Sequence, residues 1–205
     1  MSNPVLPTLS LEQALWQKGY RKIAGIDEVG RGSWAGPLVA AGVIFPKDFV
    51  LIDGIADSKL LKPRQREQLT KLITSRSLDF YIGEIPVSII NKVGIGQATN
   101  ILFRKIAKNL NADFCLIDAF YIKHFNRKNQ MAVKNGDKIC ASISAASIIA
   151  KVYRDNLMKK LSYKYPQYGF GKHKGYGTKM HQEAIKTYGF AKIHRTSYNL
   201  SFLFR

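Results

Sequence analysis

Short apolar runs alternate with longer segments of mixed polarity along this chain. The runs 22–28, 37–45 and 114–118 are mainly apolar and have the length of buried strands, and 79–85 has the composition of a further strand. In 95–110, apolar side chains recur at helical spacing. The other helices are expected at 11–18, 63–75, 141–163 and 179–188.

Several residues mark where these elements begin and end. Ser10 with Gln13 has the pattern of a capping box, in which two side chains satisfy backbone amides at a helix start. Pro63 suits a first helical position, because its missing N–H is not needed there. The basic stretch that follows residue 118 and the Gly-, Tyr- and Lys-rich stretch 166–177 are expected to be loops.

The order of these elements favours one α/β domain. Strands cluster early and alternate with helices later, and no repeat, low-complexity tract or linker divides the chain. We therefore expect a single catalytic domain over residues 1–205, which includes a basic, helical, substrate-binding segment at about 151–205.

Composition excludes several classes of protein. Apolar residues make up 46% and aromatic residues 11%, enough for a core and too many for a disordered basic tail. No run reaches the roughly 18 apolar residues of a membrane span, and MSNPVLPTLSLEQ lacks the pattern of a signal peptide. Cys115 and Cys140 form neither a disulfide framework nor a CxxC metal site, so we expect free thiols in a cytoplasmic protein.

The charge points to a polyanionic partner. Lys and Arg number 32 against 14 Asp and Glu, a net charge of +18. Residues 151–205 carry 12 basic and 2 acidic groups, a net of +10, which makes this segment the better candidate for contact with a phosphate backbone. The alternative is a soluble protein that is basic without a nucleic-acid partner.

Four of the few acids stand at informative places. Asp27 and Glu28 follow one apolar run, Asp118 ends another, and Asp137 precedes the long helix. Converging carboxylates repel one another unless a cation compensates, and their hard oxygens favour Mg²⁺ or Mn²⁺. On a basic protein this pattern suggests two-metal phosphodiester chemistry. The alternative is that each acid is an ordinary cap or turn residue, because spacing does not show convergence.

Two glycine-containing segments could contact a nucleic acid. Gly30, Arg31 and Gly32 follow the acid pair, and their backbone could approach a sugar or phosphate closely. The segment 172–177 combines cations, glycines and Tyr176, which could grip a phosphate and stack on a base or sugar. The alternatives are a plain tight turn and a solvated basic loop.

Five segments together resemble the type 2 ribonucleases H (ribonuclease HII). They keep that family's order and spacing and cover nearly the whole chain; the first and the third are specific in combination. The segments are GIDEVGRGSWAGPLVAA at 25–41, DSKL at 57–60, LID at 116–118, GDKICASISAASIIAKVYRD at 136–155 and HKGYGTKMH at 173–181.

The resemblance implies a fold and an activity. The fold is RNase H-like, a mixed five-stranded sheet flanked by helices with a C-terminal helical portion. The activity is endonucleolytic cleavage of the RNA strand in RNA–DNA hybrids and 5′ of single ribonucleotides embedded in duplex DNA, leaving 3′-hydroxyl and 5′-phosphate ends. The implied cofactor is a pair of Mg²⁺ or Mn²⁺ ions, and we expect a monomer with no membrane partner.

The resemblance also implies roles for particular residues. Asp27, Glu28, Asp118 and Asp137 match the family's catalytic, metal-binding acids. Gly30–Gly32 match its sensor of the 2′-hydroxyl and the RNA–DNA junction. Tyr176 matches the tyrosine that packs against the deoxyribose after the ribonucleotide, and Lys59 matches a lysine near the scissile region. We expect His173, His181 and His194 to be structural or to contact phosphate.

The sequence departs from the family pattern at two places. Gly189-Phe190-Ala191 stands where the family often has GPT, which affects local loop shape. The C-terminus SYNLSFLFR has paired aromatics without the Gln usual in clamp-binding peptides, so sliding-clamp binding stays open. The rival classes are a non-catalytic nucleic-acid-binding module, a DNA-directed nuclease or transposase of the same superfamily, and a ribosomal or structural basic protein.

Overall fold

The computed structural model describes residues 6–56, 58–59 and 61–204. Its centre is a mixed five-stranded sheet in the order β3-β2-β1-β4-β5. The first three strands in the chain pair antiparallel, and β4 and β5 extend the sheet in parallel from β1, which confirms the predicted sheet. The strands are β1 Ile23–Val29, β2 Leu38–Ile44, β3 Asp79–Ile85, β4 Phe114–Asp118 and β5 Gln130–Val133.

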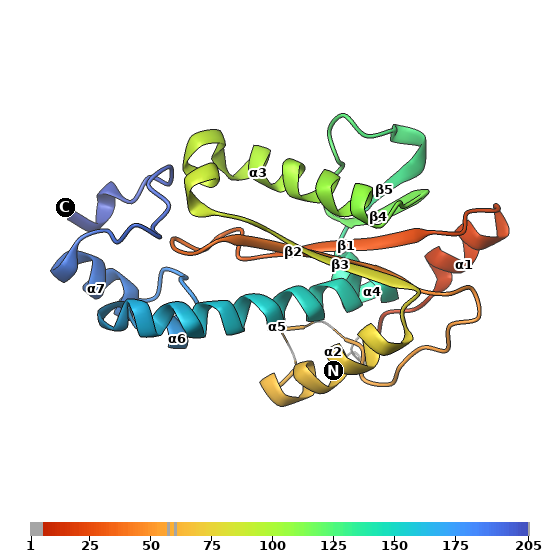
Figure 1. Ribbon diagram of the computed structural model, residues 1–205, viewed down its shortest axis with the longest axis horizontal. Helices are drawn as coiled ribbons and strands as arrows, with labels where there is room; N and C mark the ends of the chain where they lie inside the picture. The colour runs from red at the N-terminus through yellow and green to blue at the C-terminus, as the bar shows by residue number, and fades with distance from the viewer. Residues whose placement is uncertain (1–5, 57, 60, 205) are drawn as a thin grey trace.

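Helices cover both faces of the sheet. Figure 1 shows α3 (Val87–Asn109) on one face and the long α5 (Ala141–Lys164) on the other, with α2 (Pro63–Arg76) packed outside α5. The C-terminal segment lies at one end of α5. The remaining elements are α1 Ser10–Gln17, α4 Gly136–Ile139, α6 Phe170–His173, α7 Lys179–Tyr188, and the 3₁₀ turns η1 Arg127–Asn129, η2 Pro166–Tyr168 and η3 Ser201–Phe204.

The alternation of side chains along the strands builds two cores. In β4, for example, Leu116 packs into the core under α5, whereas Cys115 and Ile117 pack into the core under α3. The thiols of Cys115 and Cys140 are free and buried. None of the described helices is both long and apolar enough to cross a membrane.

Some predicted elements differ from the structure. The capping box at Ser10 is wrong: α1 begins at Ser10, Leu9 stands at the cap position, and the Ser10 hydroxyl contacts the Thr8 hydroxyl at 3.0 Å. The helix predicted from 95 begins earlier, at Val87. It consists of two helical segments that meet at Gly94, whose φ of 77° breaks the regular helical geometry.

Strand β5 falls inside a stretch predicted to be a loop. It has four residues and begins with Gln130, whose amide holds the preceding loop through hydrogen bonds to Ile122 N and Ile122 O at 2.7 and 3.1 Å. A strand so short, opened by a buried polar residue, has too little apolar periodicity to be recognised from sequence.

Candidate active site at the end of the central strands

The two central parallel strands stop pairing before β1 ends. Their described register runs only to Ile26 and Ile117, after which β1 continues to Val29 alongside β2. Asp27 and Glu28 were predicted at the end of this strand, but they lie inside β1. They face the point where β4 terminates at Asp118. The gap beside β1, beyond the end of β4, leaves room for side chains from both strands.

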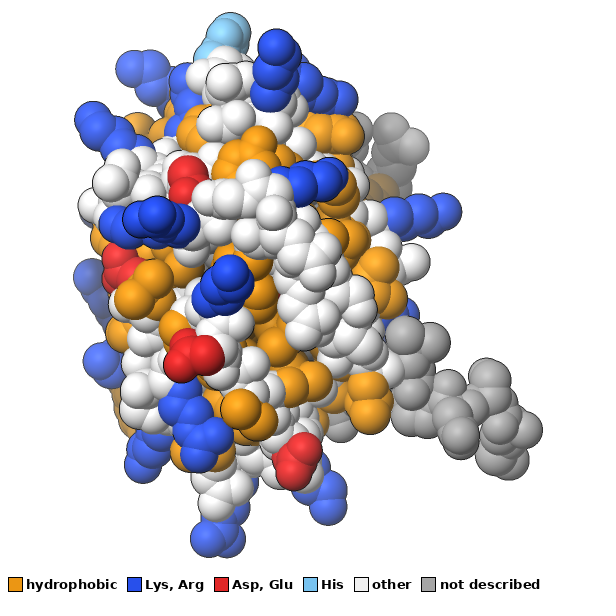
Figure 2. Space-filling view, turned by 90° about the vertical axis from the view of Figure 1, so that its right-hand side faces the viewer, with side chains coloured by type: hydrophobic (Ala, Val, Ile, Leu, Met, Phe, Trp, Pro, Cys, Tyr) orange, Lys and Arg blue, Asp and Glu red, His pale blue; other side chains and the backbone are white. Residues whose placement is uncertain are grey.

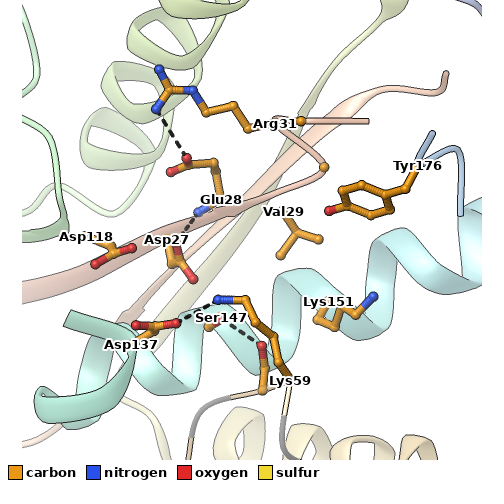
Figure 3. A pocket seen from close by; sticks show the side chains of 13 residues that line it. Asp27, Glu28, Val29, Arg31, Lys59, Asp118, Asp137, Ser147, Lys151 and Tyr176 are labelled. Atoms are coloured by element: carbon orange, nitrogen blue, oxygen red, sulfur yellow. Dashed lines mark hydrogen bonds and ion pairs between the residues drawn. The ribbon is translucent and has the colours of Figure 1, made fainter. Parts of the chain in front are cut away.

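All four predicted acids line one cleft of about 500 Å³. Asp27 and Asp137 are buried, and Glu28 and Asp118 are half-buried. Figure 3 shows Asp27, Asp118 and Asp137 around a common space, whereas Glu28 leaves the other side of β1 and points toward Arg31. The structure thus supplies the convergence that spacing did not show.

The backbone of α4 keeps two of the acids together. Asp118 Oδ1 accepts a hydrogen bond of 2.7 Å from the amide of Gly136, the first residue of α4, and Asp137 is the next residue. Asn135 adopts a left-handed conformation, with φ 55°, that turns the chain into this short helix. The hydrogen bond fixes α4 against the end of β4, so residues distant in sequence share one cleft.

Two cations reach these carboxylates. Lys59 Nζ lies 3.1 Å from Asp137 Oδ2, and the Arg31 guanidinium lies 3.9 Å from Glu28 Oε1. The Lys59 segment is tied to α5 by a contact of 3.0 Å between the hydroxyls of Ser58 and Ser147. The other residues of that DSKL motif, Asp57 and Leu60, lie outside the described residues.

Burial, together with repulsion between the carboxylates, raises the pKa values of two of the acids. Burial raises the pKa of Asp27 well above its usual range, and the charges of Glu28 and Asp118 raise it further. Burial also raises the pKa of Glu28 to about 7, although Arg31 opposes this. Glu28 Oε2 is buried without a hydrogen-bond partner among the described residues. A bound cation would relieve the repulsion and give this oxygen a partner.

The donor set fits divalent ions. Four carboxylates supply hard oxygen ligands of the kind that Mg²⁺ and Mn²⁺ prefer. Among the described residues, no three Asp, Glu, His or Cys side chains are already arranged to hold one ion. Binding would therefore draw the carboxylates closer than they stand, and the unpartnered oxygen of Glu28 is free to make that movement.

The turn after β1 lines the same cleft. Gly30 has a φ of 88°, and a Cβ added there would lie 2.0 Å from Arg154 Nε, so only glycine fits. At Gly32, by contrast, an added Cβ would meet open space. The first glycine is therefore required by the fold, whereas the second leaves room beside the cleft.

Tyr176 reaches the cleft from the C-terminal segment and is 37% exposed. The carbonyl of the preceding Gly175 accepts hydrogen bonds from Trp34 N at 2.8 Å and Ala35 N at 3.3 Å. The stretch 166–177, predicted to be a loop, contains η2 and α6. It is docked on the β1–β2 connection and is not a freely solvated loop.

The three histidines expected to be structural or to contact phosphate make contacts within the C-terminal segment. His181 Nδ1 lies 3.0 Å from the Tyr176 carbonyl, and its Nε2 lies 3.0 Å from His194 Nε2. His173 stacks on His181 with ring centroids 4.5 Å apart. None of the described residues that line the cleft is a histidine. These rings support the backbone of Tyr176 from behind.

Sequence reasoning missed several residues of α5. Ser147 and Lys151 line the cleft, and Arg154 packs behind it. They stand four and then three residues apart, which places them on one face of the helix. That spacing was the signal available in the sequence. For Arg195, which also packs behind the turn, no signal beyond its charge was present.

The C-terminal turn η3 holds the paired aromatics for which clamp binding was left open. The Phe202 ring packs edge-on against Trp34, and Phe204 packs in the same way against Phe190, with centroids 5.9 Å apart in both pairs. Both phenylalanines stay more than half exposed. Each is anchored to the molecule by a ring contact and presents its other surface to solvent.

Comparisons with known proteins agree on one fold. The structure is similar to the ribonuclease H2 from Pyrococcus horikoshii OT3, with 30% identity and a TM-score of 0.67, covering 87% of this chain and 94% of that one. It is also similar to the RNase HII in the PCNA:RNase HII complex from Archaeoglobus fulgidus, with 24% identity and a TM-score of 0.74, covering 89% and 97%.

Sequence comparison identifies the family. The family model of ribonuclease HII matches residues 24–201. A ribonuclease HII from Roseiflexus castenholzii is 46% identical over 198 residues, which cover 94% of this chain and 88% of that protein. The cleft residues described above all lie within the matched span. The chain therefore belongs to the ribonuclease HII family and is a type 2 ribonuclease H, a hydrolase that acts on the RNA of RNA–DNA hybrids.

Proposed function

We propose that this ribonuclease H also cuts 5′ of single ribonucleotides embedded in duplex DNA. The reaction is hydrolysis of a phosphodiester that leaves 3′-hydroxyl and 5′-phosphate ends, supported by two Mg²⁺ or Mn²⁺ ions. One observation carries the proposal: four carboxylates line a single cleft beside a glycine turn, on a protein with a net charge of +18.

The acids have the role of ligands. Asp27, Glu28, Asp118 and Asp137 would hold the ions, and the unpartnered Glu28 Oε2 supports that role. Bound ions of this kind activate a water for attack and stabilise the leaving 3′-oxygen. No residue of the chain need act as a nucleophile, and the described lining offers no histidine as a general base.

Selection of a ribonucleotide rests on the 2′-hydroxyl, the only group that marks it within DNA. The backbone of Gly30–Gly32 borders the acids, where it can read that group, and Tyr176 lies across the same cleft, where it can pack against the next sugar. The Lys59 side chain is 73% exposed even though it pairs with Asp137. It can therefore also contact a phosphate near the scissile bond.

Basic side chains at the surface would hold a duplex by its phosphates. Figure 2 shows Lys and Arg spread around the end opposite the C-terminal segment, with few acids among them. Within residues 151–205, Arg154 and Arg195 are fully buried, so these two do not contribute to contact with a duplex. We expect affinity for a duplex to fall steeply with salt.

The deciding experiment is cleavage of a duplex that carries one ribonucleotide, with and without Mg²⁺, beside an all-DNA duplex. The proposal predicts metal-dependent incision 5′ of the ribonucleotide and an intact all-DNA control. Binding without cleavage would instead indicate a non-catalytic module, and equal cleavage of both duplexes would indicate a DNA-directed nuclease.

A further inference from the structure

Two arginines behind the glycine turn are fully buried, Arg154 on α5 and Arg195 near the C-terminus. Among the described residues, neither forms an ion pair with a carboxylate. Burying a charge that only neutral hydrogen-bond acceptors surround costs free energy. Burial accordingly lowers the pKa of both guanidinium groups. Such an arrangement calls for a reason beyond packing.

The hydrogen bonds of these arginines converge on the turn. Arg154 Nη2 donates to Ser33 Oγ at 2.8 Å, and that hydroxyl donates to the Gly30 carbonyl at 2.8 Å. Arg195 Nη1 donates to the Arg31 carbonyl at 2.9 Å. A second donor, the hydroxyl of Tyr198, reaches the same Arg31 carbonyl.

Further donors of the two arginines fasten the rest of the β1–β2 connection, although Arg195 Nη2 has no hydrogen-bond partner among the described residues. Arg154 also donates to the carbonyls of Ala35 and Pro37, and to that of Lys174 in the Tyr176 loop, at 3.0–3.1 Å. Arg195 Nε donates to the Gly36 carbonyl at 3.0 Å. The two guanidinium groups therefore join the turn, the connection after it and the loop that carries Tyr176.

Peptide geometry converts these contacts into an orientation. In a trans peptide, the carbonyl of one residue and the amide of the next point in opposite directions. Since the carbonyls of Gly30 and Arg31 point toward buried donors, the amides of Arg31 and Gly32 point the other way. Both of these residues line the cleft, and within the described backbone neither amide donates a hydrogen bond.

We propose that Arg154 and Arg195 are positioning residues for ribonucleotide selection, acting with the hydroxyls of Ser33 and Tyr198. They hold the Gly30 and Arg31 carbonyls from behind, so that the amides of Arg31 and Gly32 are presented to the substrate ribose before it arrives. The inference rests on the proposed incision at single ribonucleotides. It adds that selection also depends on groups that never touch the substrate.

Two mild variants test this role. Ser33→Ala and Tyr198→Phe each remove one hydroxyl that holds a carbonyl of the turn. Tyr168→Phe is the matched control, because its hydroxyl donates to the Gly189 carbonyl at 2.9 Å, in the same C-terminal segment but away from the turn. Arg195→Lys is a stronger variant that keeps the charge and loses the forked geometry.

The readout is kcat/KM on a duplex with one ribonucleotide divided by kcat/KM on a hybrid whose cut strand is all RNA. A loosened turn should lower kcat/KM more on the single-ribonucleotide duplex than on the hybrid, because that duplex offers only one 2′-hydroxyl for recognition. Losing one hydrogen bond corresponds to a fall in this ratio of about 3- to 10-fold in each hydroxyl variant. Affinity for an all-DNA duplex should stay unchanged, and Arg195→Lys should lower the ratio further.

Specific results would overturn the inference. A wild-type ratio in both hydroxyl variants refutes it, and so does an equal fall in Tyr168→Phe. The hydroxyl variants decide the question alone if Arg195→Lys does not fold. The wild-type chain tests the proposed incision separately. If it cleaves the hybrid but not the single-ribonucleotide duplex, the proposed incision fails and this inference fails with it. If it cleaves both substrates and the hydroxyl variants keep the wild-type ratio, only this inference fails.

Discussion

Replacing either glycine of the turn by alanine should separate the fold from the function. At Gly30 the new Cβ would lie 2.0 Å from Arg154 Nε, on a backbone with φ 88°. At Gly32 it would meet nothing within 4 Å, and the residue is exposed. The same change, made two residues apart, should thus destabilise the fold at Gly30 and spare it at Gly32.

The cost of Gly30→Ala can be worked from these contacts. The left-handed backbone costs about 1–2 kcal/mol for a residue with a Cβ. Displacing Arg154 endangers its four hydrogen bonds, each worth about 1 kcal/mol. The free energy of unfolding should fall by about 3–6 kcal/mol, which for a chain of this size lowers Tm by about 10–20 °C.

Gly32→Ala should leave the free energy of unfolding within about 0.5 kcal/mol of the wild type. Its Cβ would occupy the space in which we place the ribose, so kcat/KM on a single-ribonucleotide duplex should fall by about 10- to 100-fold, as expected for losing a buried hydrogen bond. Thermal unfolding and initial cleavage rates measure the two effects on the same samples. Equal losses of Tm in the two variants, or wild-type cleavage by Gly32→Ala, would refute this reasoning.

Three further predictions concern the acids, the tyrosine and the histidines. Asp118→Asn should abolish cleavage while changing the Kd for a duplex little, as measured by turnover and by binding titration; normal turnover would remove Asp118 from the metal site. Tyr176→Ala should weaken cleavage at single ribonucleotides more than in long hybrids, and equal losses would contradict its role. Burial lowers the pKa of His181 to about 4, so below pH 6.5 the unfolded chain takes up a proton that the folded chain refuses. Stability should therefore fall between pH 6.5 and 4, by up to about 3 kcal/mol from this residue, and His181→Gln should remove that part of the pH dependence of Tm; an unchanged dependence would refute the assignment.

The sequence predicted the elements that carry their own periodicity. The apolar runs of β1, β2 and β4 were recognisable because they are buried on both faces, and Pro63 marked the start of α2 as predicted. Where a tertiary contact decides, pattern reasoning failed. Ser10 looked like a cap, but the bridge between Thr8 and Cys140 places the chain so that α1 begins one residue earlier than predicted.

The candidate site shows the same division. Motifs predicted which acids matter, but their convergence depends on β4 ending at Asp118 while β1 continues to Val29, and on the amide of Gly136 holding Asp118. Neither fact has a signature in spacing. Arg154 and Arg195 were counted as surface charge, because a cation is ordinarily exposed. Only packing reveals that these two are enclosed by backbone carbonyls.

Two groups of charged side chains are energetically unfavourable as they stand, the clustered carboxylates and the buried guanidinium groups. Both groups border the segment 27–32. In front, four carboxylates share a cleft with too few cations, which favours binding of divalent ions. Behind, two guanidinium groups are buried against carbonyls, which turns the opposite ends of those peptides toward the cleft. Because Asp27, Glu28 and the turn are consecutive in β1 and its exit, an ion that Asp27 would hold and the amide that Gly32 would offer would have a fixed relation to each other. The scissile phosphate and the ribose that marks it are likewise neighbours in the substrate, so one short segment can select the nucleotide and place its bond for hydrolysis.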